Sequence, residues 1–263
     1  KESVLTVSTE GYYKLTRLEH QGITIMFNEA FANASQQLAG EEKFIKVVNK
    51  EAGNSKGTIQ VGESLTIPLI KPENINITDN MEEILSSVVT IRRGSGHGSG
   101  FFISNDGFIL TNAHVVGTSK TVMIITENGL EIEGEVLRVH EPRDVALIKI
   151  PVRVRKALAI SKLEPGVLDQ VYVVGSPIYE DMHSTVTKGI ISAYRKMKDS
   201  DNLYLQSDAA ISGGNSGGPM LNINGHVVAI SVASLSDPTA KGLNLFIPIQ
   251  DALEALKIRD EDT

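Results

Sequence analysis

The chain has 263 residues, of which 41% are hydrophobic, and its 25 lysines and arginines against 32 aspartates and glutamates give a net charge of −7. This length allows one large core or two smaller ones, and the acidic balance argues against nucleic acid as the main partner, because phosphate binding needs a basic surface. The absence of cysteine excludes disulfides, cysteine-ligated zinc and a thiol nucleophile. With no long apolar run and no signal peptide at Lys1, we expect no membrane span and either a cytosolic protein or a processed form.

Residues 1–71 are predicted to form a small α+β domain of their own. The pattern indicates, in order, a strand, two helices and a half-buried strand, at Tyr12–Leu18, Ile25–Leu38, Glu41 to about Glu51, and Val61–Pro68. This order, and its closing Val-Gly-Glu-Ser-Leu-Thr-Ile-Pro in particular, resembles a LysM module. The resemblance implies binding to peptidoglycan or another N-acetylglucosamine polymer, while a packing or oligomerisation domain stays open as the alternative. No residue is assigned to glycan binding, and residues 72–80 are predicted to be a polar linker.

From residue 81 onward the pattern changes to many short strands, with one short helix before them and one helix after them. Strands are expected at 88–92, 101–104, 108–111, 122–126, 132–139, 145–150, 170–174, 187–193, 203–207, 219–223, 226–233 and 242–248, with helices at 81–87 and 249–256. Hairpin turns are predicted at Asp106-Gly107, Asn128-Gly129 and Asn224-Gly225. The glycine-rich stretch 94–100 is expected to be a flexible turn, and residues 259–263 a solvated tail. Regular turns between short strands favour an all-β sandwich or barrel.

Ser216 lies in Asp208-Ala-Ala-Ile-Ser-Gly-Gly-Asn-Ser-Gly-Gly-Pro219, among four glycines that let a substrate carbonyl approach the backbone. As a nucleophile it would need a base, and the N–H groups of Gly214 and Ser216 would be the natural donors to an oxyanion. The same residues also fit the G-x-S-x-G elbow of α/β-hydrolases, in which the histidine follows the serine. His226 alone follows Ser216, only ten residues later. The order His, Asp, Ser of chymotrypsin therefore fits better.

Two further stretches supply the base and the acid. His114 lies in Leu110-Thr-Asn-Ala-His-Val-Val116, where small and apolar neighbours would hold an imidazole in one orientation. Asp144 precedes the strongly apolar Val145–Ile150, a place where a carboxylate is costly unless its charge is used. Taken alone, His114 could be a structural histidine and Asp144 a turn residue, so the assignment depends on the three stretches together.

Thr-Asn-Ala-His-Val-Val, Asp-Val-Ala-Leu-Ile-Lys and Gly-Asn-Ser-Gly-Gly-Pro, in this order in a cysteine-free chain, closely resemble the trypsin-like serine proteases of the HtrA/Deg family. The resemblance implies a mainly β protease domain over residues 81–263, built of two antiparallel six-stranded β-barrels. It implies a catalytic triad of His114, Asp144 and Ser216, with neither metal nor other cofactor. The oxyanion hole is expected at Gly214, Asn215 and Ser216, and the substrate pocket at Ala210, Ile211, Ser231, Val232 and Ala233.

The predicted function is therefore that of a serine endopeptidase. An alanine at position 210, without a counter-charge for Lys or Arg, predicts cleavage after small to medium apolar residues, which are exposed in unfolded or damaged proteins. The resemblance also implies a homotrimer in the periplasm or cell envelope of a bacterium. Family members usually carry a PDZ domain after the closing helix, and we expect it to be absent here or to have been removed. The alternative is a catalytically silent binding or scaffolding protein that retains the protease fold.

Overall fold

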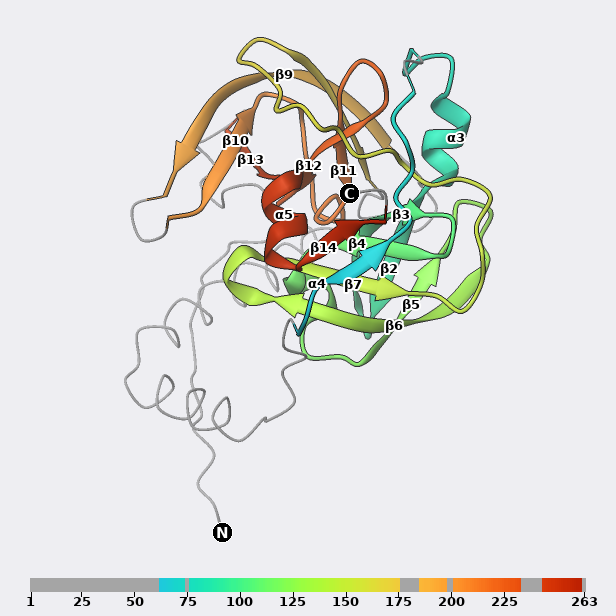
Figure 1. Cartoon of the computed structure of the whole chain (residues 1–263). Coiled ribbons are helices and arrows are strands. Elements are labelled where there is room, and N and C mark those ends of the chain that lie inside the picture. Colours follow the sequence, from blue (N-terminus) through green and yellow to red (C-terminus); the bar gives the residue numbers. More distant parts are fainter. Residues whose placement is uncertain (1–61, 74–75, 176–184, 198–200, 233–242, 262–263) are drawn as a thin grey trace, which may run out of the picture. The chain divides into compact units, whose positions relative to one another are not determined.

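Two closed barrels of antiparallel strands dominate the structure (Figure 1). The computed structural model describes residues 62–73, 76–175, 185–197, 201–232 and 243–261. The first barrel has the strand order β2-β3-β4-β7-β6-β5 and the second β10-β13-β12-β11-β8-β9. The predicted pair of six-stranded barrels is thus confirmed, and closure leaves neither sheet with an unpaired edge. The expected LysM-like helices lie outside the described residues.

The first barrel, in green in Figure 1, contains β2 (Val88–Arg93), β3 (Gly96–Ser104), β4 (Phe108–Thr111), β5 (Thr121–Ile125), β6 (Glu131–His140) and β7 (Val145–Lys149). The second contains β8 (Gln170–Gly175), β9 (Thr185–Lys196), β10 (Leu203–Ser207), β11 (Pro219–Leu221), β12 (Val227–Ser231) and β13 (Asn244–Pro248). Outside the barrels lie α3 (Met81–Ser86), α4 (Ala113–Val116), the 3₁₀ turn η1 (Glu141–Arg143) and α5 (Ile249–Ala255). A separate two-stranded sheet pairs β1 (Leu65–Ile67) with β14 (Ile258–Asp260).

Strand β7 shows how the sequence builds the two barrels against each other. Its side chains alternate between the two faces of the sheet. Ala146 and Ile148 pack inside the first barrel, whereas Val145 and Leu147 join a core that also contains residues of the second barrel, such as Ile230. Because both faces are covered, the strand is apolar from Val145 to Ile148 instead of alternating with polar residues. Asp144 stands directly before this buried strand and is therefore fixed close to the junction of the barrels.

The three predicted hairpin turns are confirmed. Gly107 joins β3 to β4, Gly129 joins β5 to β6, and Gly225 joins β11 to β12, with φ angles of 85°, 78° and 74°. Such positive φ values favour glycine. In the glycine-rich stretch 94–100, by contrast, only Gly94 and Ser95 form a turn, because β3 already begins at Gly96 and pairs with β2 from Gly96 to Phe101.

The strand expected to close the N-terminal module belongs instead to the protease unit. Leu65 to Ile67 pair in parallel with Ile258 to Asp260, so part of the expected solvated tail is also a strand. The side chain of Ile67 is completely buried in the core between the barrels. The chain divides into compact units between Gly57 and Thr58, whereas the sequence predicts a boundary at residue 71. Nor is the segment 72–80 a solvated linker throughout, since Ile77 is completely buried and its N–H donates to the carbonyl of Ile223.

Candidate active site

His114 and Asp144 meet in direct contact. The His114 ring nitrogen Nδ1 lies 2.8 Å from Asp144 Oδ2 and 3.0 Å from Oδ1, and the backbone N–H of His114 donates to Oδ1 at 2.9 Å. A carboxylate can only accept hydrogen bonds, so this contact places a proton on Nδ1 and leaves Nε2 as an acceptor in the neutral ring. The His114 side chain is 47% exposed and that of Asp144 is 25% exposed. The imidazole can therefore reach a substrate while its orienting acid stays partly shielded.

The backbone around Asp144 explains how the carboxylate is aimed. Asp144 directly follows η1 as its C-terminal cap and has the left-handed conformation, with φ 59° and ψ 49°, which is uncommon for a residue other than glycine. Its N–H donates to the Glu141 carbonyl at 3.0 Å, and its own carbonyl accepts from Asn112 Nδ2 at 2.9 Å. Asn112 is completely buried and immediately precedes α4, the short helix that carries His114. The same asparagine thus ties the acid-bearing turn to the base-bearing helix.

Ser216 lies in a loop that is bonded to both barrels. Its carbonyl accepts from the N–H of Ser99 in β3 at 2.7 Å, and the Ser99 hydroxyl donates to the Gly214 carbonyl at the same distance. On the other side, the Gly217 N–H donates to the Ser231 carbonyl, and the Ser231 N–H donates to that of Gly218, both at 2.9 Å. The loop that contains Ser216 therefore lies at the junction of the barrels.

Tight glycine contacts bring this loop against the helix of His114. A methyl group on Gly217 would overlap the Ser99 carbonyl oxygen and the Thr111 hydroxyl, and would lie 3.1 Å from the N atom of Asn112. A methyl group on Gly98 would lie 2.6 Å from a Val115 methyl and 3.1 Å from the Ser216 carbonyl oxygen. The loop of Ser216 and the start of α4 are thus packed together. Among the described residues, however, no hydrogen bond joins the Ser216 hydroxyl to His114.

The turn before Ser216 presents two backbone donors. The Asn215 N–H donates to the Ser212 carbonyl at 3.1 Å, and Gly214 at the third position has φ 93°, as in a type II turn. Among the described residues, neither the Gly214 N–H nor the Ser216 N–H has a hydrogen-bond acceptor. These two N–H groups are the ones expected to bind an oxyanion. Asn215 differs from expectation, because its N–H is used inside the turn.

The residues expected to form the substrate pocket have different environments. Ala210 is exposed and its carbonyl accepts from the Thr187 hydroxyl at 2.7 Å, while Ile211 is half-buried against the core of the second barrel. Ser231 is completely buried and its hydroxyl has no hydrogen-bond partner in the described part of the chain. Val232 is half-buried and donates its N–H to the Leu245 carbonyl at 3.1 Å. Ala233 lies outside the described residues.

Several residues that shape this region were not predicted from the sequence. Ser99 and Asn112 hold the serine loop and the acid, and Asn244, buried at the start of β13, donates from Nδ2 to the Ala209 carbonyl at 2.7 Å. Asn112 does stand in the Thr-Asn-Ala-His stretch, so its place beside His114 could have suggested a role. Ser99 and Asn244 have no comparable signal, because each acts on a segment far away in the chain.

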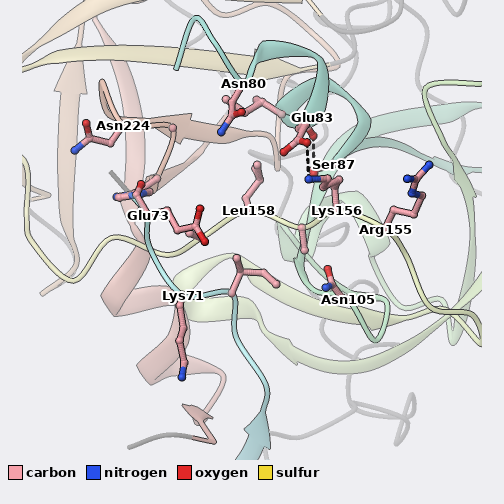
Figure 2. Close-up of a pocket in the computed structure, with 16 residues that line it drawn as sticks. Lys71, Glu73, Asn80, Glu83, Ser87, Asn105, Arg155, Lys156, Leu158 and Asn224 are labelled. Carbon is pink, nitrogen blue, oxygen red and sulfur yellow. Dashed lines mark hydrogen bonds and ion pairs between the residues drawn. The ribbon is translucent and has the colours of Figure 1, made fainter. Parts of the chain in front are cut away.

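A separate cavity of about 260 Å³ lies beside α3 (Figure 2). Its lining contains no residue of the expected triad or substrate pocket. Lys156 forms an ion pair with Glu83 there, and the Ser87 hydroxyl donates to the Glu83 carbonyl at 2.8 Å. His226 also lines this cavity, with Nε2 2.7 Å from the Glu73 carbonyl oxygen. His226 is thus engaged away from Ser216, which argues against the α/β-hydrolase arrangement.

The comparisons with known proteins agree with this geometry. The family described as the trypsin-like peptidase domain matches residues 98–230. Serine protease HTRA1A of Danio rerio is 34% identical over 193 residues, which cover 65% of this chain and 39% of that protein. HhoB of Synechocystis sp., which is named as a serine protease, is 40% identical over 169 residues, covering 61% of this chain and 39% of that protein.

A solved protease structure is also similar to this chain. The serine endoprotease from Yersinia pestis superposes with a TM-score of 0.56 at 30% identity and covers 68% of this chain and 66% of its own. The chain spans about two fifths of the length of the first curated relatives that it matches. In the part of the chain that the structure describes, no helix is long and apolar enough to cross a membrane.

Proposed function

The chain belongs to the trypsin-like peptidases of the HtrA type, and we propose that it is a serine endopeptidase with Ser216 as its nucleophile. The observation that carries the proposal is the contact between His114 Nδ1 and the Asp144 carboxylate at 2.8 Å. This contact fixes the tautomer in which Nε2 can accept a proton from a serine.

The reaction follows from these roles. Ser216 Oγ attacks the substrate carbonyl and gives its proton to His114 Nε2, and Asp144 stabilises the imidazolium that forms. The imidazolium then donates the proton to the leaving amine as the peptide bond breaks. A water molecule repeats the sequence on the acyl-enzyme and releases the second product. Movement of the Ser216 or His114 side chain on substrate binding would complete the hydrogen bond between them, since such bonds are often long before substrate binds.

The oxyanion of the tetrahedral intermediate is assigned to the N–H groups of Gly214 and Ser216. The positive φ of Gly214 and the turn bond from Asn215 to Ser212 support this assignment. Each such donor contributes on the order of 10²–10³ in rate. Asn215 supports the turn but supplies no backbone donor to the substrate.

Substrates with small to medium apolar side chains fit the pocket best. Ala210 is exposed beside the serine loop and offers no charge, which supports preference for apolar residues over Lys and Arg. Such side chains are buried in folded proteins, so unfolded or damaged chains are the proposed substrates. Peptides that differ only in Ala, Val or Lys before the cleaved bond would test this preference by their kcat/KM.

A bacterial cell envelope is the proposed place of action, and the unit of residues 1–57 is the proposed glycan-binding module. The relatives HhoB of Synechocystis and MamE of Magnetospirillum gryphiswaldense support a bacterial setting. Binding of the full chain to purified peptidoglycan, compared with a chain beginning at Thr58, tests the module directly.

Labelling by a fluorophosphonate probe tests the proposed catalytic function. The probe reacts with an activated serine, so the full chain should be labelled and should degrade unfolded casein. Ser216→Ala should abolish both, while Ser212→Ala, a change four residues before the nucleophile, should be labelled. If the probe does not label an intact, folded chain, the result would favour the alternative, a catalytically silent binding or scaffolding protein. The structural observation that supports this alternative is the missing hydrogen bond between His114 and Ser216.

A further inference from the structure

Arg143 is a buried cation next to the proposed catalytic acid. It ends η1, directly before Asp144, and only 4% of its surface is exposed. Its side chain contacts the second barrel and α5, whereas Asp144 contacts His114. An arginine is rarely buried without a specific set of partners, because its charge loses hydration.

Three groups of the second barrel and its following helix hold this guanidinium. Nη2 donates to the Leu203 carbonyl and to Asp251 Oδ2, the latter at 3.0 Å, and the guanidinium carbon lies 4.6 Å from the centre of the Tyr204 ring. Leu203 and Tyr204 belong to β10, and Asp251 belongs to α5. Both donations come from Nη2, while Nε and Nη1 have no hydrogen-bond partner among the described residues. The planar guanidinium can also lie over the Tyr204 ring, which suits it better than an ammonium group.

A second bond joins the same turn to the second barrel. Asn202 Nδ2 donates to the Pro142 carbonyl at 2.8 Å. Two successive residues of η1, Pro142 and Arg143, are therefore bonded to Asn202 and Leu203. Asn202 directly precedes β10, and Leu203 is its first residue. Asp144 follows at once in its left-handed conformation, so its direction depends on how this turn is held.

The position of the turn matters because the proposed triad is divided between the barrels. His114 and Asp144 come from the first barrel, whereas Ser216 precedes β11 of the second. A displacement of about 1 Å in such a constellation can lower a rate about 10²-fold. A bond that fixes the acid-bearing turn to the nucleophile-bearing barrel therefore acts on the geometry of the reaction.

We propose that Arg143 is a positioning residue, which fastens η1 to β10 and α5 and so keeps Asp144 and His114 aligned with Ser216. This inference rests on the proposed endopeptidase function. Arg143 acts through Asp144 and does not contact the substrate.

The structure also indicates which variants will fold. The Asp251 side chain is 39% exposed, so removal of Arg143 leaves its carboxylate in contact with water instead of stranded in the core. Arg143→Met keeps most of the volume without the charge, and Arg143→Lys keeps the charge without the planar group that lies over Tyr204. Arg138→Met is the matched control, because Arg138 also joins the first barrel to the end of α5, by a bond of 2.7 Å to the Leu256 carbonyl, but does not contact η1.

The experiment compares the full chain with these three variants. We expect Arg143→Met to lower both the rate of fluorophosphonate labelling and kcat on an unfolded substrate by roughly 10- to 100-fold. KM should change little in Arg143→Met. The labelling rate and kcat of Arg143→Lys should lie between those of Arg143→Met and the unmodified chain, and those of Arg138→Met should equal the unmodified values. The proton resonance of His114 Nδ1–H, shifted far downfield by its bond to a carboxylate, should weaken or disappear in Arg143→Met alone.

The outcomes separate this inference from the proposed function. Labelling of Arg143→Met at the unmodified rate, with the resonance intact, would overturn the positioning role. If Arg143→Met does not fold, Arg143→Lys decides, and an unchanged rate in that variant would overturn it equally. Failure of the unmodified chain to react would contradict the endopeptidase function, and the histidine resonance would still show whether Arg143 holds the Asp144–His114 pair.

Discussion

Both the backbone and the side chain of Asp144 are held by hydrogen bonds. Its carbonyl accepts from Asn112, and its carboxylate accepts from the backbone N–H and the ring Nδ1 of His114. Oδ1 accepts from the backbone N–H, and the shorter contact of Nδ1 is with Oδ2, so the two oxygens together satisfy both donors of His114. The negative charge also stabilises the imidazolium of the proposed reaction, so the acid contributes both orientation and electrostatics.

Asp144→Asn should therefore preserve the fold and remove most of the activity. If the amide oxygen accepts from the His114 N–H, the NH₂ group faces Nδ1 and forces the ring into the tautomer with the proton on Nε2. That ring cannot accept a proton from Ser216, and kcat should fall by about 10⁴-fold. Steady-state hydrolysis of an unfolded substrate measures this loss. Asp106→Asn, which changes an aspartate paired with the exposed Arg153 in the same barrel, should leave kcat unchanged.

At the scale of an element, the position of the loop that carries Ser216 depends on close packing at Gly217. Gly217 has φ 85°, and a side chain there would collide with Ser99 in β3 and with Thr111 in β4. These contacts are made between barrels, so the glycine is needed for the close approach of two elements as well as for its conformation. The loop can lie beside α4 only as long as this position has no Cβ.

Gly217→Ala should therefore destabilise the protein more than an ordinary glycine replacement in a turn. Steric overlap typically costs about 1–3 kcal/mol, and a positive φ adds about 1 kcal/mol for a residue with a Cβ. Gly129→Ala is the control, since Gly129 has φ 78° but no atom within 4 Å of its added methyl group, so it should lose only the conformational part. Urea unfolding of both variants measures the difference. Equal losses would mean that the barrels can move apart to accept the methyl group.

Elements built from neighbouring residues could be predicted from the sequence, whereas those built from distant residues could not. The turns at Gly107, Gly129 and Gly225 follow from local backbone chemistry, and all three are present. The stretch from Gly96 to Gly100 also contains turn residues, yet it forms a strand. Its glycines are required there because added methyl groups on Gly98 and Gly100 would press on Val115 and Ile109.

In the candidate site, too, residues in short local stretches could be predicted, whereas residues held by distant segments could not. His114, Asp144 and Ser216 could be proposed because each lies in a characteristic short stretch, and the order of these stretches favours one arrangement. Arg143 carries no such signal, since Leu203 and Asp251 contact it from far along the chain. For the same reason the pairing of β1 with β14 could not be predicted: a strand is expected over Val61–Pro68, but its partner lies at the far end of the chain.

At the scale of the whole molecule, the segment before the barrels is part of the protease unit. Arg138 Nη2 donates to the Glu63 carbonyl at 2.6 Å, while Nη1 donates to the carbonyl of Leu256 at the end of α5. Burial lowers the pKa of Arg138 from its usual value, although the arginine stays charged at neutral pH. Lys257 Nζ adds a bond of 3.1 Å to the Gly62 carbonyl. The start of the described chain is thus bonded to both the first barrel and the end of α5.

A chain that begins at Thr58 should therefore fold by itself, whereas one that begins at residue 72 should be clearly less stable. The shorter chain loses β1, and with it the completely buried side chain of Ile67. Removing a buried isoleucine alone costs about 2–5 kcal/mol, and 1 kcal/mol corresponds to about 2–4 °C in Tm for a domain of this size. Thermal unfolding should place the shorter chain at least about 4–8 °C below the longer one. Ile223→Ala in the longer chain is a control, because Ile223 is 52% exposed and its loss should change Tm little. Equal Tm values for the two chains would mean that Ile67 contributes nothing to the core between the barrels. They would contradict the assignment of β1 to the protease unit.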